Sequence, residues 1–155
     1  MNHQAKKIQE FLKKYGIKSE VKELSETTKT AAEAAKALNC EIGQIAKSIV
    51  FKGKFSNQPI LVIASGSNRI GEKTIAAYLG EEIEKADADF VREKTGFAIG
   101  GVPPFGHREK IKTFIDEDLL RYRVIWAAAG THIAVFPLSL EELVKATAGK
   151  VVKVI

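Results

Sequence analysis

The sequence predicts an α+β fold in which a mixed, mostly antiparallel sheet or open barrel is covered by short helices. Predicted strands outnumber helices, and they occur in hairpins among short helices instead of in regular strand-helix alternation. The 155 residues are 45% hydrophobic, enough for one buried core, and no repeat or linker divides them. We therefore expect a single domain over residues 1–155.

The N-terminal part is predicted to contain two helices with a short strand between them. Apolar residues recur at helical spacing from Gln4 to Tyr15, and Gly16 follows where a helix end favours a left-handed residue. The segment 19–24 alternates polar and apolar residues like a half-buried strand. The residues at 30–33 have the spacing of a capping box, which predicts a helix through Leu38.

The central part is predicted to form a hairpin followed by two helices. The runs 45–52 and 59–65 are rich in β-branched residues, and Gly, Ser and Asn lie between them. Apolar residues before Gly80 have helical spacing, and Gly80 ends that helix. A further helix is expected over 87–94, with Gly96 ending it.

The C-terminal part is predicted to return to strands. One strand includes 111–115 and leads into the segment 116–120. Two more, 124–130 and 132–136, are expected to pair through a tight turn at Gly130 and Thr131, so that His132 opens the second strand.

A last helix and a closing strand complete the prediction. Ser139 and Glu142 have capping-box spacing, which predicts a helix through Ala146. Gly149 is expected to end this helix before the strand 151–155.

The loop 95–107, TGFAIGGVPPFGH, holds four glycines and two adjacent prolines. Proline donates no hydrogen bond and glycine has no side chain to cover its amide, so unpaired N–H groups are expected at Gly100, Gly101 and Val102. Such amides are suited to an anion or a developing oxyanion. The same composition is also typical of an ordinary rigid turn between strands.

Lys47 interrupts an otherwise apolar predicted strand, IAKSIVF. One interpretation places it at a strand edge with its ammonium in water. The other makes it a functional cation. The pattern alone leaves both open.

Composition favours an anionic partner, because the net charge is +5 and the isoelectric point is near 9.3. Nucleic acid is preferred over a membrane, since no lipid-anchoring signal accompanies the lysines and no apolar run could span a bilayer. The lysines are nevertheless spread along the chain with acids between them. The N-terminus lacks the features of a secretory signal, so we expect a cytoplasmic protein.

No cofactor or metal is expected. The sequence has no Walker A loop, dinucleotide-binding glycine pattern, nucleophile elbow or paired zinc histidines. The lone Cys40 is predicted to be a small buried hydrophobe, and His3, His107 and His132 lie far apart in sequence.

Five segments together carry a resemblance to a known family: AKSIVF at 46–51, GSNRI at 66–70, KTGFAIGGVPPFG at 94–106, AAAGTH at 127–132 and SLEELVKAT at 139–147. In this order they resemble the YbaK family of aminoacyl-tRNA deacylases, related to the editing domain inserted in bacterial prolyl-tRNA synthetases. The resemblance covers residues 27–155. It implies a β-barrel-like domain that hydrolyses the ester of wrongly charged tRNA, commonly proline tRNA carrying cysteine or alanine.

The resemblance also implies site residues. The family's lysine falls on Lys47, and its G-x-x-x-P loop falls on Gly100 to Pro104. A histidine after the late glycine turn, which confines the aminoacyl side chain in some members, corresponds to His132 after Gly130. Cysteine-specific members often lack this histidine, which counts against a cysteine substrate.

The implied chemistry needs a water and a stabilised carbonyl oxygen. In the family a hydroxyl of the tRNA's terminal ribose is thought to position the water, and Lys47 would bind the terminal phosphate or ribose. Arg69, Lys73 and Arg108 would meet the acceptor stem, or they form an ordinary solvated surface.

Two other functions remain open from the sequence. One is a non-catalytic module that binds aminoacyl-tRNA or a synthetase through the same pocket. The other is a small-ester or peptide hydrolase, which the absence of a recognisable nucleophile and base disfavours.

Overall fold

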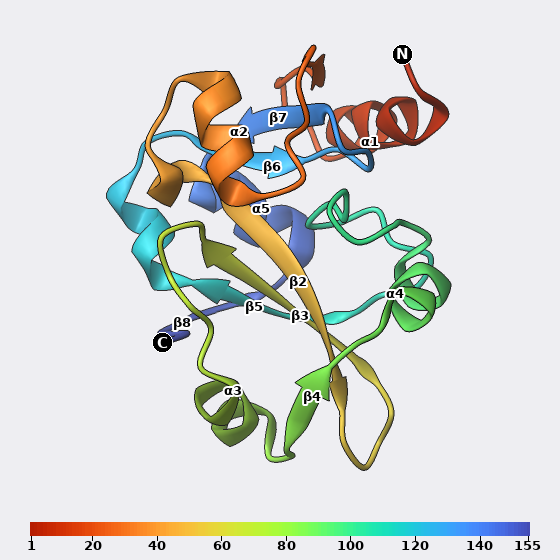
Figure 1. Cartoon of the computed structure of the whole chain (residues 1–155), viewed down its shortest axis with the longest axis vertical. Coiled ribbons are helices and arrows are strands. Elements are labelled where there is room, and N and C mark those ends of the chain that lie inside the picture. The colour runs from red at the N-terminus through yellow and green to blue at the C-terminus, as the bar shows by residue number, and fades with distance from the viewer.

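The computed structural model describes residues 1–155 and contains two sheets with helices packed around them (Figure 1). The smaller sheet has strand order β1-β7-β6, and the larger has order β4-β2-β3-β5-β8. The strands are β1 (Lys22–Glu23), β2 (Ala46–Gly53), β3 (Pro59–Ser65), β4 (Ile83–Lys85), β5 (Lys112–Asp116), β6 (Ile125–Ala128), β7 (Ala134–Leu138) and β8 (Lys150–Val152). The helices are α1 (His3–Lys14), α2 (Ala31–Leu38), α3 (Glu72–Leu79), α4 (Ala88–Thr95) and α5 (Leu140–Thr147), with 3₁₀ turns η1 (Ile42–Gln44) and η2 (Glu117–Arg121).

The pairing of the strands confirms the predicted α+β class. The strands β2 and β3 form the expected antiparallel hairpin, and β6 pairs antiparallel with β7. The larger sheet is mixed, because β5 runs parallel to both β3 and β8. Neither sheet closes on itself.

The two faces of the larger sheet pack against different elements. On one face, Ile75 of α3 is buried among side chains of β2, β3, β5 and the C-terminal segment. On the other face, Ala5, Ile8 and Leu12 of α1 and Leu143 of α5 join the largest buried cluster together with the smaller sheet. The strand β3 is buried along its whole length.

The two sheets meet along β2 and β6 and then separate. A single parallel bridge joins Ile45 to Trp126. From Ala46 to Val50, β2 pairs with β3 alone, and β4 joins its other edge only from Phe51 onward. An open seam therefore lies beside the first half of β2.

The helix ends follow the predicted signals with one exception. Capping boxes are present at Thr30 and Ser139, and Gly80 and Gly96 are left-handed at the ends of α3 and α4. The end of α5 was assigned wrongly: Ala148 takes the left-handed conformation, with φ of 56°. No helix is long and apolar enough to cross a bilayer.

Some strand boundaries differ from the prediction. The strand expected over 19–24 is reduced to two residues, and β4 was missed because three residues carry too little pattern. The strand β7 begins at Ala134, because the amide of Ala129 bonds the carbonyl of Ala134 and closes a longer turn. His132 therefore lies in that turn and does not open the strand.

Candidate functional site

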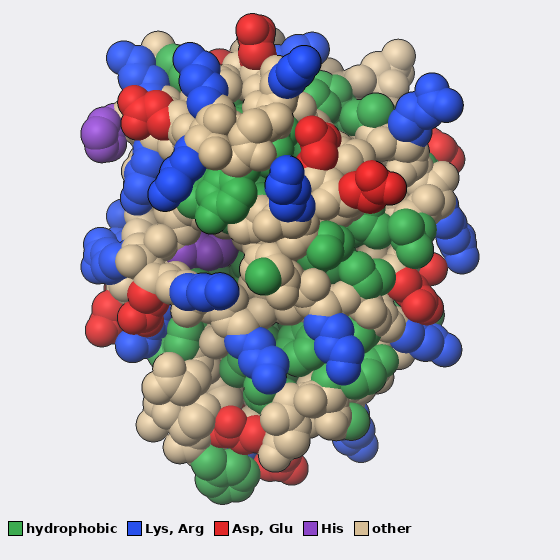
Figure 2. Space-filling view, turned by 180° about the vertical axis from the view of Figure 1, so that it is seen from behind, with side chains coloured by type: hydrophobic (Ala, Val, Ile, Leu, Met, Phe, Trp, Pro, Cys, Tyr) green, Lys and Arg blue, Asp and Glu red, His purple; other side chains and the backbone are tan.

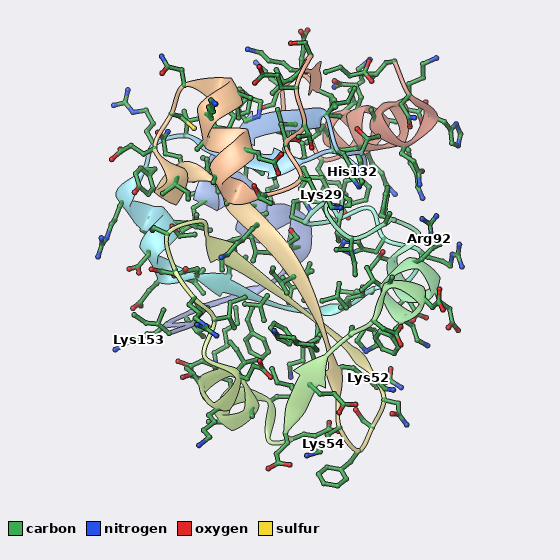
Figure 3. All side chains as sticks on the ribbon, viewed as in Figure 1. Lys29, Lys52, Lys54, Arg92, His132 and Lys153 are labelled. Carbon is green, nitrogen blue, oxygen red and sulfur yellow. The ribbon has the colours of Figure 1, made fainter.

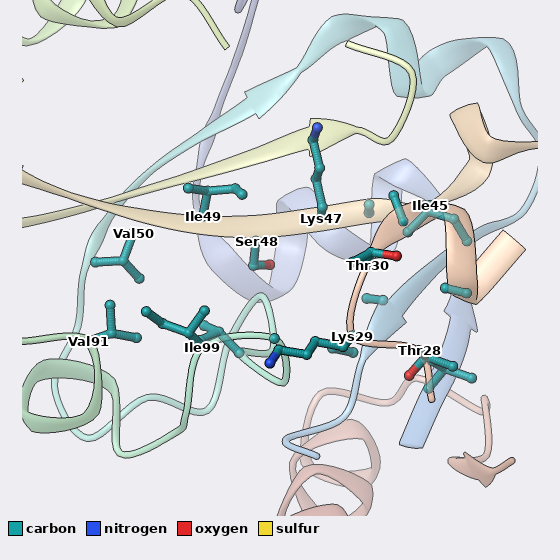
Figure 4. A pocket seen from close by; sticks show the side chains of 18 of the residues that line it. Thr28, Lys29, Thr30, Ile45, Lys47, Ser48, Ile49, Val50, Val91 and Ile99 are labelled. Atoms are coloured by element: carbon teal, nitrogen blue, oxygen red, sulfur yellow. The ribbon is translucent and has the colours of Figure 1, made fainter. Parts of the chain in front are cut away.

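A pocket of about 560 Å³ fills the seam between the two sheets (Figure 4). Its size falls within the range of small-molecule sites and exceeds what an alanyl or cysteinyl group alone would occupy. Most of its walls are apolar. The walls are formed by α2 and the segment before it, by β2, β4, β6, β7 and α4, and by residues 95–107, which we call the glycine-proline loop. The lining residues are Thr28–Ala31, Ala34, Ile45–Phe51, Lys85, Ala86, Val91, Ile99, Gly100, Val102, Trp126–Ala128 and Val135.

Side chains of β2 alternate between the two sides of the strand, as the pleat requires. Ser48 points toward Ile99 and Lys29, whereas Lys47 and Ile49 point to the opposite side (Figure 4). Lys47 therefore lines the pocket at the strand edge, while its ammonium extends away from the glycine-proline loop. The sequence could not show this separation.

The ammonium of Lys47 is held by the chain itself. Its Nζ donates to the backbone carbonyl of Asn68 at 2.8 Å. Burial lowers the pKa of Lys47 below its usual value, and the nearby carboxylate of Asp116 partly opposes that shift. The side chain thus has one fixed partner and a reduced preference for the charged form.

A buried carboxylate organises the loop that holds Lys47. Asp116 is only 1% exposed, and its Oδ2 accepts from the amide of Ser65 at 2.9 Å and from Asn68 Nδ2 at 2.8 Å. Its Oδ1 accepts from the amide of Asp118, and Asn68 Nδ2 also donates to Asp118. This network fixes the carbonyl of Asn68, and hence the direction of the lysine.

The hydroxyl of Ser48 is buried and has no hydrogen-bond partner in the molecule. An unpaired buried polar group costs free energy, and this hydroxyl lies in an otherwise apolar wall. Sequence reasoning missed Ser48. The available signal was a second polar residue directly after Lys47 in an apolar strand.

The glycine-proline loop differs from the prediction at one amide. The N–H of Gly101 donates to the carbonyl of Ala98 at 3.0 Å, so it is not free. The N–H groups of Gly100 and Val102 have no acceptor within the chain, and both residues line the pocket. Two of the three expected donors are therefore open.

The two adjacent glycines are needed for different reasons. Gly100 has a φ of +92°, which residues with a side chain rarely adopt. Gly101 packs against the next loop, because a Cβ there would lie 3.0 Å from backbone atoms of Thr131. Glycine is thus required at position 100 by the backbone conformation and at position 101 by close packing.

The helix α1 supports the loop from behind. A Cβ on Gly106 would lie 3.0 Å from Ile8, and the Phe11 and Phe105 rings stack at 4.8 Å. Gln4 Nε2 donates to the carbonyl of Gly96 at 3.0 Å. These contacts hold both ends of the loop against the core.

His107 forms a hydrogen bond within the glycine-proline loop. Its Nε2 lies 2.7 Å from the carbonyl of Pro103, so this nitrogen carries the proton. Burial lowers the pKa of His107, the Pro103 bond opposes the shift, and the charge of Lys7 adds to it. The imidazole is therefore neutral and structural.

The remaining predicted residues lie around the pocket and not in its wall. His132 Nε2 lies 3.3 Å from the carbonyl of Ile99, and Figure 3 shows His132 beside Lys29. Gly130 is packed behind the site against Phe97, and Pro104 is buried. Arg69 is exposed in the loop on the Lys47 side of β2.

The pocket wall contains no carboxylate, imidazole or thiol. Its polar side chains are the hydroxyls of Thr28, Thr30 and Ser48, the indole of Trp126, and Lys29, Lys47 and Lys85, of which Lys47 turns its ammonium away from the glycine-proline loop. No group of three or more His, Cys, Asp or Glu side chains is placed to hold a metal ion. The arrangement offers backbone donors and cations, without a conventional nucleophile or general base.

The residues that form this pocket lie in a segment that matches a known protein family. The family model of the aminoacyl-tRNA editing domain matches residues 25–146. The chain belongs to this family. The activity that accompanies such a domain is hydrolysis of aminoacyl-tRNA esters. The matched segment contains the pocket and the glycine-proline loop, whereas α1 lies outside it.

Individual relatives agree with the family. A solved structure described as a candidate trans-editing enzyme for prolyl-tRNA synthetase is 40% identical, with a TM-score of 0.93 over 99% of this chain and 98% of that one. The uncharacterised protein YwhH of Bacillus subtilis is 28% identical over 94% of this chain and 92% of its own length. A proline-tRNA ligase of Limosilactobacillus fermentum is 34% identical over 58% of this chain, which is 16% of the ligase.

Proposed function

We propose that this protein is a trans-editing deacylase that hydrolyses the ester of mischarged tRNA, with proline tRNA carrying a small amino acid as its substrate. The observation that carries the proposal is the pair of open amides at Gly100 and Val102 on the wall of an apolar pocket. Similarity to segments of proline-tRNA ligases supports the choice of tRNA. Because the substrate is charged tRNA, we place the reaction in the cytoplasm.

In this proposal the open amides act as oxyanion donors. The ester carbonyl lies against the glycine-proline loop, and the N–H groups of Gly100 and Val102 stabilise the charge that develops on its oxygen. Because the wall has no carboxylate or imidazole, the water is positioned by the substrate's own ribose hydroxyl. The unpaired hydroxyl of Ser48 is a donor for the polar part of the bound nucleoside or amino acid.

Two other predicted residues keep proposed roles. Lys47 is proposed to bind the terminal ribose or phosphate at the edge of β2. His132, which reaches the carbonyl of Ile99 beside Gly100, is proposed to limit the size of the aminoacyl side chain. The presence of this histidine favours alanine over cysteine as the removed residue.

A panel of charged tRNAs tests the function directly. The protein should release alanine from alanyl-tRNA(Pro) faster than cysteine from cysteinyl-tRNA(Pro), and should leave prolyl-tRNA(Pro) intact. Adding prolyl-tRNA synthetase shows whether the synthetase is a partner, because recruitment would accelerate release. Tight binding of charged tRNA with no release of amino acid would instead establish a non-catalytic binding module.

A further inference from the structure

Lys29 is an exposed residue at the rim of the pocket, and the proposed chemistry gives it no role. It lines the pocket, and Figure 4 shows its side chain extending toward Ile99. A Cβ on Gly100 would lie 2.6 Å from Lys29 Cγ and 3.3 Å from its Cε. The aliphatic part of Lys29 therefore runs over the face of Gly100, next to an open amide.

The backbone on both sides of Lys29 is fixed. The amide and hydroxyl of Thr28 both donate to the carbonyl of His132, the hydroxyl at 2.9 Å. On the other side, Thr30 is the N-cap of α2 and forms a capping box with Glu33. These bonds hold the Cα of Lys29 over the pocket, while four side-chain torsions leave its ammonium free to reach a ligand.

The charge of Lys29 has no partner within the protein. The four ion pairs of the chain involve Lys54, Lys94, Arg121 and the N-terminus. The ammonium of Lys47 points to the other side of β2, and that of Lys52 lies over the Phe90 ring at 5.4 Å. Figure 2 shows basic and acidic side chains interleaved on the back of the molecule, so no single basic block there competes for an anion.

We propose that Lys29 binds the phosphodiester that joins the ester-bearing terminal nucleoside to the rest of the nucleic acid. This inference rests on the proposed function. A pocket of about 560 Å³ holds a nucleoside with its aminoacyl group, so the chain must leave through the mouth. The phosphate then lies beside Lys29, which adds to the binding of the nucleic acid and leaves the position of the ester to the pocket.

Variants of Lys29, with a control on the adjacent helix α2, test the assignment. Lys29→Met keeps an apolar stem and removes the charge, Lys29→Arg keeps the charge, and Lys36→Met removes an exposed lysine that does not line the pocket. Each is assayed with alanyl-tRNA(Pro) and with 3′-O-alanyl-adenosine, an ester without phosphate.

The expected result is specific to the phosphate. Lys29→Met should raise KM for the tRNA about tenfold, since it loses a charge-assisted bond. It should leave kcat, and KM for alanyl-adenosine, near the wild-type values. The slope of log affinity against log salt should fall in magnitude by about 0.7, the value for one single-strand phosphate. Lys29→Arg and Lys36→Met should resemble the wild type.

Equal rises in KM for both esters, or no difference between Lys29→Met and Lys36→Met, would overturn the inference. If the wild-type protein hydrolyses neither ester, the proposed function fails. Binding of an uncharged acceptor-stem minihelix then tests whether Lys29 contacts a phosphate. Weaker binding and a smaller salt slope for Lys29→Met alone then support the phosphate contact. Unchanged binding and slope reject it.

Discussion

Two turns of this protein differ in whether their backbone N–H groups are hydrogen-bonded within the chain. In the turn between β2 and β3, the amides of Phe55 and Ser56 both donate to the carboxylate of Glu81, at 2.7 and 2.5 Å. In the glycine-proline loop, only Gly101 pairs its amide internally, and Gly100 and Val102 leave theirs open beside the pocket.

The difference distinguishes a turn built for stability from one built for a ligand. Both turns lie next to a helix, and glycine occurs at both, as Gly53 at the end of β2 and as four residues of the glycine-proline loop. An amide that finds an acceptor within the chain stabilises the fold, whereas an open amide in an apolar wall is available to an anionic oxygen from outside. The pairing of the amides, and not the number of glycines, marks the candidate site.

Lys47→Ala tests whether the open amides are sufficient on their own. We expect the variant to lose deacylation of alanyl-tRNA(Pro), because it removes the cation proposed to bind the terminal ribose or phosphate. The fold should persist, since alanine fits a strand and the Asp116 network does not include the ammonium as a donor to its carboxylate. Initial rates and circular dichroism measure the two quantities. Unchanged turnover would remove Lys47 from the site.

Gly100→Ala and Gly101→Ala compare an open amide with a paired one. Gly100→Ala should lower the deacylation rate about 10²- to 10³-fold, the typical cost of one oxyanion donor, because the new Cβ twists the loop and collides with Lys29. Gly101→Ala should instead destabilise the fold by about 1–3 kcal/mol, through overpacking against Thr131. Steady-state rates and denaturant unfolding separate the two. The reverse pattern, with Gly101→Ala catalytically dead but stable, contradicts the assignment.

His107 links the stability of the loop to pH. Burial places its pKa in the folded protein below the ordinary value of 6.5, so the unfolded chain binds more protons once the pH falls under about 6.5. The free energy of unfolding should therefore decrease as the pH drops through that region and continue to decrease to the lowered folded pKa. His107→Gln keeps a donor for Pro103 without titrating and should flatten this decrease, while His3→Gln should not. Urea titrations between pH 7 and pH 5 provide the measurement.

Glu81→Gln should have the smallest effect and should spare the site. The amides of Ser56 and then Phe55 lower the pKa of Glu81, against a rise from burial, so its contribution is present above about pH 4.5 and disappears as the pH falls through the lowered value. The variant should melt slightly earlier at neutral pH and match the wild type in strong acid. Its deacylation rate should equal the wild-type rate. A clear loss of activity would show that the two turns are not independent.

Local signals predicted much of the fold because they act over a few residues. The capping boxes at Thr30 and Ser139 and the hairpin of β2 and β3 all formed as expected. The parallel pairing of β5 with β3 and β8 left no local pattern, since it joins segments far apart in the chain. The same distance hid Lys29, which reaches Gly100 only after the fold brings them together.

The sequence showed where the candidate site could lie, but not its geometry. Glycine and proline content indicated the loop, but the internal bond of Gly101 to Ala98 depends on the three-dimensional turn. The direction of Lys47 depends on Asn68 and Asp116, which lie in other segments. Sequence composition thus located the donors without showing which of them are open.

Amide chemical shifts measured with a bound transition-state mimic test the central claim most directly. A phosphonate analogue of alanyl-adenosine places an anionic tetrahedral oxygen where the oxyanion would form. We predict that titrating it into ¹⁵N-labelled protein moves the amide protons of Gly100 and Val102 strongly downfield, with little change at Phe55 and Ser56. Binding of the analogue with both Gly100 and Val102 unmoved would contradict the account.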